Sequence, residues 1–219
     1  MAELSERICP AAVQAGQIIF EALLSDASLD TYRKGSGEPG GKWPMRVKMK
    51  DSYPNHYERA FENWLIDNRI EHVAVDEHKR TAFGHSDIKS FDFLLYPPDR
   101  PIIIAEVKGR KFKGTSLEKL AGFECWVTIG DVEGLTRWQR IFGEGHQAIF
   151  VFAYKVENID VDFDGRDYFD FDSNKYLFFC VKLDDYRRFM KGRSPKWQTV
   201  TLSADKFRDC AGHISNFLL

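Results

Sequence analysis

The chain lacks any run of about 18 apolar residues, which argues against a membrane-spanning helix. Its first residues, MAELSERICPAA, carry early acidic side chains and no long apolar stretch, so we expect no secretory signal. The four cysteines are far apart and form no CxxC pair, which argues against a zinc ribbon and a disulfide-stapled scaffold. Cys125 and Cys180 lie in apolar runs and are predicted to be buried thiols, which fits a reducing cytoplasm.

The chain also lacks an excess of basic residues. Its formal net charge is −2, so a nucleic-acid partner would need a local basic patch. Two stretches could supply such a patch, although a charge run is more commonly a solvated face. The first comprises Arg33, Lys34, Lys42, Arg46, Lys48 and Lys50, and the second comprises Lys108, Arg110, Lys111 and Lys113.

The apolar content of 43% is enough for a chain of 219 residues to bury a sizeable core. Residues 9–30 look helical, and residues 34–45 are rich in glycine and proline, as in a linker. We therefore expect an N-terminal helix and basic linker over residues 1–50. An α/β domain would follow over residues 51–219, with a core at about 55–154 and a C-terminal extension at 155–219.

Periodicity predicts the elements of this domain. An amphipathic helix begins after Asn55, which is a good N-cap. Strands are expected at 71–77, 90–97, 102–108 and 147–154, with a loop at 79–89, a helix at 131–142 and a further strand possible at 124–129. The tail predicts a strand at 175–183, a helix capped by Asp184, a strand at 196–202 and a final helix capped by Ser203. This order predicts a central mixed β-sheet flanked by helices.

Two of these strands flank the turn PPDRP and form a predicted antiparallel hairpin. If the turn centres on Asp99, opposed residues have numbers that sum to 198, as Asp92 and Glu106 do. Opposed side chains on one face have Cβ atoms about 5 Å apart. Lys108 shares the face of Glu106, because alternate residues of a strand point the same way. A slip of one residue would separate the three.

Two carboxylates and one ammonium suit the hydrolysis of phosphodiesters. Close carboxylates repel one another and favour a divalent cation between them, and Mg²⁺ prefers oxygen ligands and shares phosphate oxygens. A nearby lysine can orient the attacking water or stabilise charge on the phosphate. The competing interpretation is a surface hairpin with an ordinary Glu–Lys pair. The apolar run IIIA before Glu106, and Phe91 and Phe93 around Asp92, favour buried charges with a function.

The segments SFDFLLYP and IIIAEVKGRKF resemble the motif of the PD-(D/E)xK, or restriction-endonuclease-like, nucleases. HYERAFENWLIDNRI is similar to the opening helix of the archaeal Holliday-junction resolvases within that superfamily. The resemblance covers about residues 55–154 and implies an αβββαβ core, with metal ligands at Asp92 and Glu106 and a catalytic role for Lys108. It also implies a metal-site glutamate at Glu58. One departure is that Phe91, and not proline, precedes Asp92.

Three further assignments leave alternatives open. Glu58 stands three residues after Asn55, so it could be part of a capping box, and Glu62 is a competing acid. Gln139 resembles the glutamine that the second helix of such nucleases supplies to the site, but a solvated helix face explains it equally well. Arg110, Lys111, Lys113 and Arg137 could bind nucleic-acid phosphates.

The resulting expectation is a cytoplasmic Mg²⁺-dependent endonuclease, with Mn²⁺ as a substitute, that hydrolyses phosphodiester bonds in DNA. A branched substrate would need paired active sites, which a homodimer supplies. The alternatives are an inactive nuclease-fold module that binds nucleic acid or protein, and an unrelated interaction protein. Residues 160–165 echo a calcium loop, but the twelfth position is Phe171, so an acidic solvated loop is the better interpretation.

Overall fold

The computed structural model describes residues 55–75, 82–83, 86–87, 89–117, 120, 122–158, 160–163 and 167–219. The expected N-terminal helix at 9–30, the linker, the first basic stretch and Cys9 lie outside these residues, as does part of the calcium-loop echo. The described residues, apart from 141–143, group into one compact unit. No helix in the described part of the chain is both long and apolar enough to cross a membrane.

Helix α2 (His56–Asp67) is the first described element and begins where the sequence predicts. The side chain of Asn55 caps it by accepting hydrogen bonds from the backbone N–H groups of Tyr57, at 3.0 Å, and Glu58, at 3.2 Å. Its buried face consists of Ala60, Phe61, Trp64 and Leu65, which recur at helical spacing. This face packs into the core, so burial and capping together explain the helix.

The main sheet is mixed, as predicted. Its path runs through β1 (Glu71–Ala74), β4 (Phe93–Tyr96), β5 (Ile102–Phe112), β7 (His146–Val156), β9 (Asn174–Lys182) and β12 (Gly212–His213), and β8 (Phe169–Phe171) also pairs with β9. Only β5 and β7 are parallel; the other neighbours are antiparallel. Helix α3 (Ile129–Phe142) connects β5 to β7. The sequence of α2, β1, β4, β5, α3 and β7 confirms the predicted αβββαβ order.

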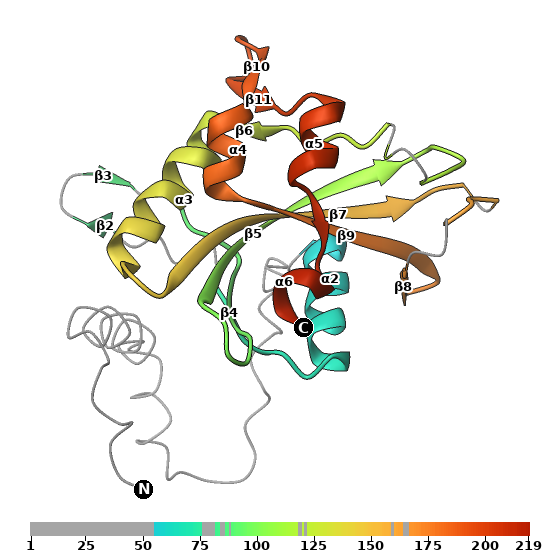
Figure 1. The fold of residues 1–219 in the computed structure, drawn as a ribbon, viewed down its shortest axis with the longest axis horizontal. Coiled ribbons are helices and arrows are strands. Elements are labelled where there is room, and N and C mark those ends of the chain that lie inside the picture. The colour runs from blue at the N-terminus through green and yellow to red at the C-terminus, as the bar shows by residue number, and fades with distance from the viewer. Residues whose placement is uncertain are drawn as a thin grey trace, which may run out of the picture. The chain divides into compact units, whose positions relative to one another are not determined.

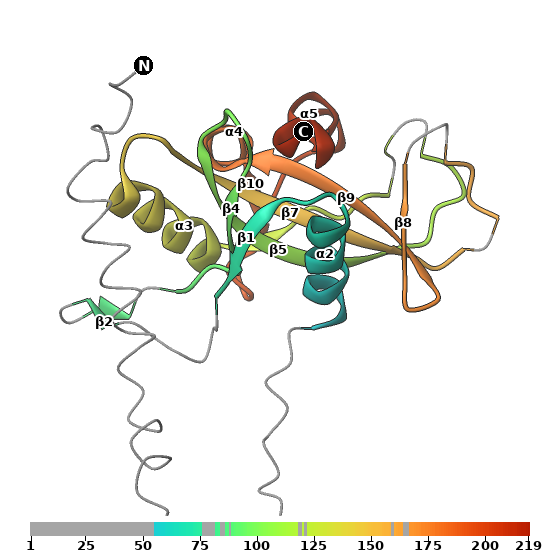
Figure 2. The same ribbon diagram turned by 90° about the horizontal axis from the view of Figure 1, so that it is seen from below.

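Helices cover both faces of the sheet (Figures 1 and 2). One face packs against α2 and α6 (Ser215–Leu218), and Ala105 and Val107 of β5 belong to its core. The opposite face lies under α4 (Leu183–Phe189) and α5 (Ala204–Cys210), where Tyr186 contacts Phe150. Since side chains alternate along a strand, Glu106 and Lys108 belong to this second face.

The hairpin register matches the prediction. Phe93 pairs with Ala105, Leu94 with Ile104 and Leu95 with Ile103, and the numbers of each pair sum to 198. Asp99 lies at the tip with a φ of 54°, a left-handed conformation that aspartate tolerates better than most residues. The inference that Asp92 and Glu106 stand at the same level of the hairpin therefore rests on the observed ladder.

Several short elements differ from the prediction. The stretch expected as a loop holds β2 (Ala82–Phe83) and β3 (Ser86–Asp87). A separate sheet joins β10 (Lys191–Ser194), which was not predicted, to β11 (Thr199–Thr201) and β6 (Val127–Thr128), which lie within the strands expected at 196–202 and 124–129 but are shorter. Strands of two residues are too short to show alternation in a sequence. Asp184 is not the cap of α4, because the helix begins one residue earlier at the fully buried Leu183 and Lys182 is its N-cap.

The tail holds further elements that the sequence did not predict. Ser203 caps α5 as expected, accepting a hydrogen bond from the N–H of Lys206 at 3.4 Å. That helix is not the last, because β12 and α6 follow it. The prediction that Cys125 and Cys180 are buried is confirmed, with exposed fractions of 3% and 0%.

Candidate functional site

Three carboxylates are buried in the described part of the chain: Asp92, Glu106 and Asp131, which are 5%, 2% and 3% exposed. Removing a carboxylate from water is costly unless the protein supplies partners for its charge. Each of these three carboxylates therefore needs hydrogen-bond donors or cations around it. Asp92 and Glu106 come from the predicted motif, whereas Asp131 was not predicted to be part of the site.

Asp92 lies just before β4 and binds to the backbone of β5. Its N–H donates to the carbonyl of Ala105 at 3.0 Å, and its Oδ2 accepts the N–H of Val107 at 2.6 Å. Because Val107 stands between Glu106 and Lys108, the Asp92 carboxylate is held at the level of the ExK segment. The hairpin thus holds Asp92 level with Glu106, as the predicted register requires.

The two oxygens of the Glu106 carboxylate have different surroundings. Oε1 accepts the ammonium of Lys108 at 2.5 Å and that of Lys89 at 3.4 Å. Oε2 is buried and has no hydrogen-bond partner among the described residues. A buried carboxylate oxygen without a partner is unfavourable, so this atom is an open acceptor for a cation.

Asp131 joins the same cluster from the first turn of α3. Its Oδ2 accepts the N–H of Thr128 at 2.7 Å, and the Thr128 hydroxyl accepts the N–H of Asp131 at 3.1 Å. This reciprocal pair is a capping box. The other oxygen, Oδ1, lies 3.2 Å from the ammonium of Lys108 and also binds that of Lys89. Two lysines and two carboxylates therefore form one charge-balanced network.

The network shifts the pKa values of Lys89 and Asp131. Burial by itself would lower the pKa of Lys89, but the negative charges of Glu106 and Asp131 outweigh it and raise that pKa. Burial would likewise raise the pKa of Asp131, and the charge of Lys108 and the contact with Lys89 overcome it and lower that pKa. Both side chains consequently carry their charges near neutral pH.

Sequence reasoning missed both Lys89 and Asp131. The spacing of Thr128 and Asp131 is that of a capping box, and this signal marks a helix start two residues before the one predicted. Nothing local distinguishes Lys89, whose place depends on contacts with residues 17 and 42 positions away. The indole of Trp138 donates to the carbonyl of Lys89 at 2.8 Å and holds this segment on α3.

The residues fit a divalent cation in one respect. Mg²⁺ is commonly bound through only one or two carboxylates, with waters completing its shell. Asp92 and the open Oε2 of Glu106 supply that number of groups. No set of three or more His, Cys, Asp or Glu side chains is placed to hold a metal ion in the described part of the chain. The fit is therefore to a cation held by two carboxylates and water, and not to a closed protein cage.

Glu58 is not part of such a three-ligand group. The Asn55 amide donates to its carboxylate, so it takes part in capping α2. Helix α2 covers the sheet face of Ala105 and Val107, whereas Glu106 belongs to the other face. Within this structure the capping interpretation of Glu58 is observed, and its metal role is still a prediction. The competing acid Glu62 lies 3.9 Å from the imidazole of His72.

Gln139 and Arg137 lie on α3, further along than Asp131. The side-chain oxygen of Gln139 accepts the N–H of Ala148 at 2.7 Å and so connects α3 to the beginning of β7. Gln139 therefore has a structural contact that neither of its two predicted roles, a site residue or part of a solvated helix face, included. Arg137 is exposed. The expected catalytic role of Gln139 and the phosphate-binding role of Arg137 remain predictions.

The basic residues after Lys108 differ in how firmly other protein groups hold their side chains. The guanidinium of Arg110 lies 3.8 Å from the ring centre of Trp126 and donates to the carbonyls of Gly109, at 2.7 Å, and Trp126. Lys111 forms an ion pair with Glu157 at 2.6 Å. These residues line an open pocket of about 560 Å³ together with Tyr57, Lys113, Glu124 and Trp126. Arg110 is therefore mainly structural, and Lys111 and Lys113 are the better candidates for phosphate contacts.

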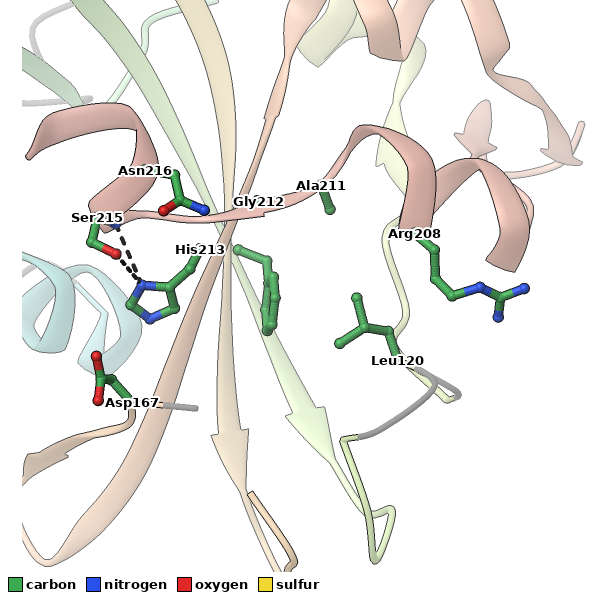
Figure 3. A pocket seen from close by; sticks show the side chains of 9 residues that line it. Leu120, Asp167, Arg208, Ala211, Gly212, His213, Ser215 and Asn216 are labelled. Atoms are coloured by element: carbon green, nitrogen blue, oxygen red, sulfur yellow. Dashed lines mark hydrogen bonds between the residues drawn. The ribbon is translucent and has the colours of Figure 1, made fainter. Parts of the chain in front are cut away.

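A second pocket, of about 420 Å³, lies between α5, β9 and the C-terminal residues. Figure 3 shows His213 on its wall, with its Nδ1 facing the hydroxyl of Ser215 at 2.7 Å, and Asp167 nearby. Its lining includes none of the residues of the charged network. The predicted site and this pocket are thus separate features of the chain.

Comparisons with known proteins give little further information. No protein-family model matches the chain, and no curated protein matches it. A solved structure of the Holliday junction resolvase Hjc from Archaeoglobus fulgidus is similar with 14% sequence identity and a TM-score of 0.45, over 76% of this chain and all of that one. A similarity of this size does not establish a family.

Proposed function

We propose that this protein is a divalent-metal-dependent nuclease that hydrolyses phosphodiester bonds, with DNA as its substrate and Mg²⁺ or Mn²⁺ as its metal. The observation that carries the proposal is the divided environment of Glu106. Two ammonium groups bind Oε1, while the buried Oε2, at the hairpin level of Asp92, has no partner among the residues that the structure describes. A surface Glu–Lys pair would be solvated and would not show this asymmetry.

The residues have separate tasks in this proposal. Asp92 and Glu106 would hold the cation, which when bound would withdraw electron density from the phosphate and acidify a nearby water. Lys108, whose side chain is 16% exposed, is fixed beside Glu106 and would stabilise the charge that develops on the phosphate oxygens. Lys89, with 44% of its side chain exposed, would be the more accessible of the two cations for an incoming phosphate.

Binding of the nucleic-acid backbone would fall to the exposed cations near the end of β5. Lys113 and Lys111 are exposed, and Lys111 would have to exchange its ion pair with Glu157 for a phosphate. Such contacts give affinity without reading sequence. They also predict that binding weakens with rising salt concentration, because bound counterions are released from the nucleic acid.

The test is a cleavage panel of plasmid, single-stranded and branched DNA with EDTA, Mg²⁺ or Mn²⁺. Asp92→Asn keeps the shape of the side chain and removes its charge, so we expect the metal-dependent rate to fall by about 100-fold or more. Asp184→Asn is the matched control, because that carboxylate is 71% exposed on α4 and should leave the rate unchanged. Equal rates for wild type and Asp92→Asn would overturn the proposal.

One observation favours a second candidate, a nuclease-fold module that binds DNA without cutting it. The described residues assemble no three-donor metal group, and both lysines already neutralise Glu106 and Asp131. Such a module would bind DNA in EDTA as tightly as in Mg²⁺ and would cut none of the substrates. The same panel, with binding measured by fluorescence anisotropy, separates the two functions.

A further inference from the structure

Asp131 is buried more deeply than a capping residue needs to be. The capping box uses only its Oδ2, which accepts the N–H of Thr128. The second oxygen, Oδ1, is directed to the ammonium groups of Lys108 and Lys89 and not to water. Because the side chain is almost fully enclosed, it depends on these two cations to compensate its lost hydration.

The position of Asp131 bears on which oxygen of Glu106 the lysines occupy. The ammonium groups of Lys108 and Lys89 both contact the same oxygen of Glu106, Oε1. Both also contact Oδ1 of Asp131. An ammonium between two carboxylate oxygens is held in one place, whereas an ammonium with a single carboxylate partner can move to either of its oxygens.

Helix α3 controls the position of Lys89 as well as that of Asp131. The indole of Trp138 binds the Lys89 carbonyl, and Gly134 brings the helix so close that an added Cβ would stand 3.2 Å from that carbonyl oxygen. Asp131 begins the same helix through its capping box. One helix therefore positions both Lys89, which contacts Glu106, and Asp131, which contacts Lys108.

Resting on the proposed function, we infer that Asp131 is a positioning residue that holds Lys108 on one oxygen of Glu106 and so keeps the other oxygen open for the cation. Asp131 itself does not bind the metal or the substrate. In its absence the Lys108 ammonium is free to approach Oε2 and compete with the divalent ion. The inference assigns a task to a residue outside the D…ExK motif.

The test measures the binding of Mn²⁺ alone by isothermal titration calorimetry, without DNA. Asp131→Asn should weaken Mn²⁺ binding by about 10- to 100-fold, the range found for groups that orient metal ligands. Adding Lys108→Met to that variant removes the competitor, so the double variant should bind Mn²⁺ within about twofold of Lys108→Met alone. If Asp131 had a purely structural role, removing Lys108 would not restore the Mn²⁺ affinity that Asp131→Asn loses.

The outcomes are distinguishable. If Asp131→Asn binds Mn²⁺ as wild type does, or the double variant stays as weak as Asp131→Asn, the inference is wrong. If Asp131→Asn alone does not fold, a double variant that binds at least tenfold more weakly than Lys108→Met contradicts it. Glu133→Gln, an exposed change on the same helix, should match wild type. A wild-type protein that neither binds Mn²⁺ nor cuts DNA would instead refute the proposed function.

Discussion

Gly109 shows how a single residue controls the distance between α2 and β5. It follows Lys108, and the ring of Tyr57 lies against its backbone, so that an added Cβ would stand 2.1 Å from Tyr57 Cδ2. The Tyr57 ring is itself flanked by His56 at 3.9 Å and Tyr176 at 6.2 Å between ring centres. These neighbours leave the ring little room to give way.

Gly109→Ala should therefore destabilise the fold by about 1–3 kcal/mol, the usual effect of overpacking. The measurement is the free energy of unfolding from urea titration. Gly192→Ala serves as the control, since an added Cβ at Gly192 meets nothing within 4 Å, and should change stability by less than about 0.5 kcal/mol. Equal stabilities for the two variants would show that Tyr57 moves aside.

Helix α2 shows how an element is specified locally and anchored by packing. Asn55 satisfies two of the free N–H groups at its beginning, and four buried residues attach it to the sheet. The sequence contains both signals, so the beginning of this helix directly after Asn55 could be predicted. The beginning of helix α3 was predicted two residues too late, because its Thr128–Asp131 capping box precedes the apolar pattern.

Asn55→Ala should lower the free energy of unfolding by about 1 kcal/mol, because the N–H groups of Tyr57 and Glu58 lose their acceptor. Asn63→Ala is a matched control in the middle of the same helix. Among the described residues its amide donates to the carbonyl of Arg59 alone, and alanine favours helix, so stability should not fall. A loss at Asn63 as large as that at Asn55 would contradict the capping explanation.

At the scale of the whole described unit, the C-terminal residues complete the core and are not an appendage to it. Strand β9 pairs with β7 over eight residues, and Phe178 and Phe179 are buried on its two sides. Strand β12 then pairs with β9, with His213 opposite Phe179. The chain beyond the αβββαβ core thus contributes to the sheet that supports the site.

We expect His213 to make the stability of the fold sensitive to acid. Burial lowers its pKa below the ordinary value of 6.5, and Asp167 only partly opposes this. Because the folded state then binds the proton more weakly than the unfolded state, stability is fully present above pH 6.5 and decreases as the pH falls toward the lowered pKa. Urea titrations between about pH 8 and 5 should show this decrease.

His213→Asn removes the titrating group and should reduce the loss of stability on acidification. The free energy of unfolding is plotted against pH for wild type and variant, and the two slopes are compared. Any effect of the substitution that does not depend on pH then cancels. Equal slopes would show that other groups cause the acid sensitivity.

The sequence by itself determined the core order and the register of the hairpin. These features follow from local patterns, namely apolar periodicity, the Asn55 cap and a turn centred on Asp99. The register placed Asp92 level with Glu106, and the ladder of Phe93 with Ala105 confirms that arithmetic. The predicted roles of Glu58, Gln139 and the basic residues could not be decided in this way, because each depends on distances across the fold.

Only the tertiary structure decided which charges surround Glu106. Lys89 contacts Glu106 directly, and Asp131, 42 residues further along, joins the cluster through Lys89 and Lys108. The sequence periodicities of strands, two residues, and of helices, 3.6 residues, carry no information about contacts between such distant segments. The buried carboxylates require partners because of their desolvation, but packing alone selects those partners and leaves one oxygen of Glu106 open.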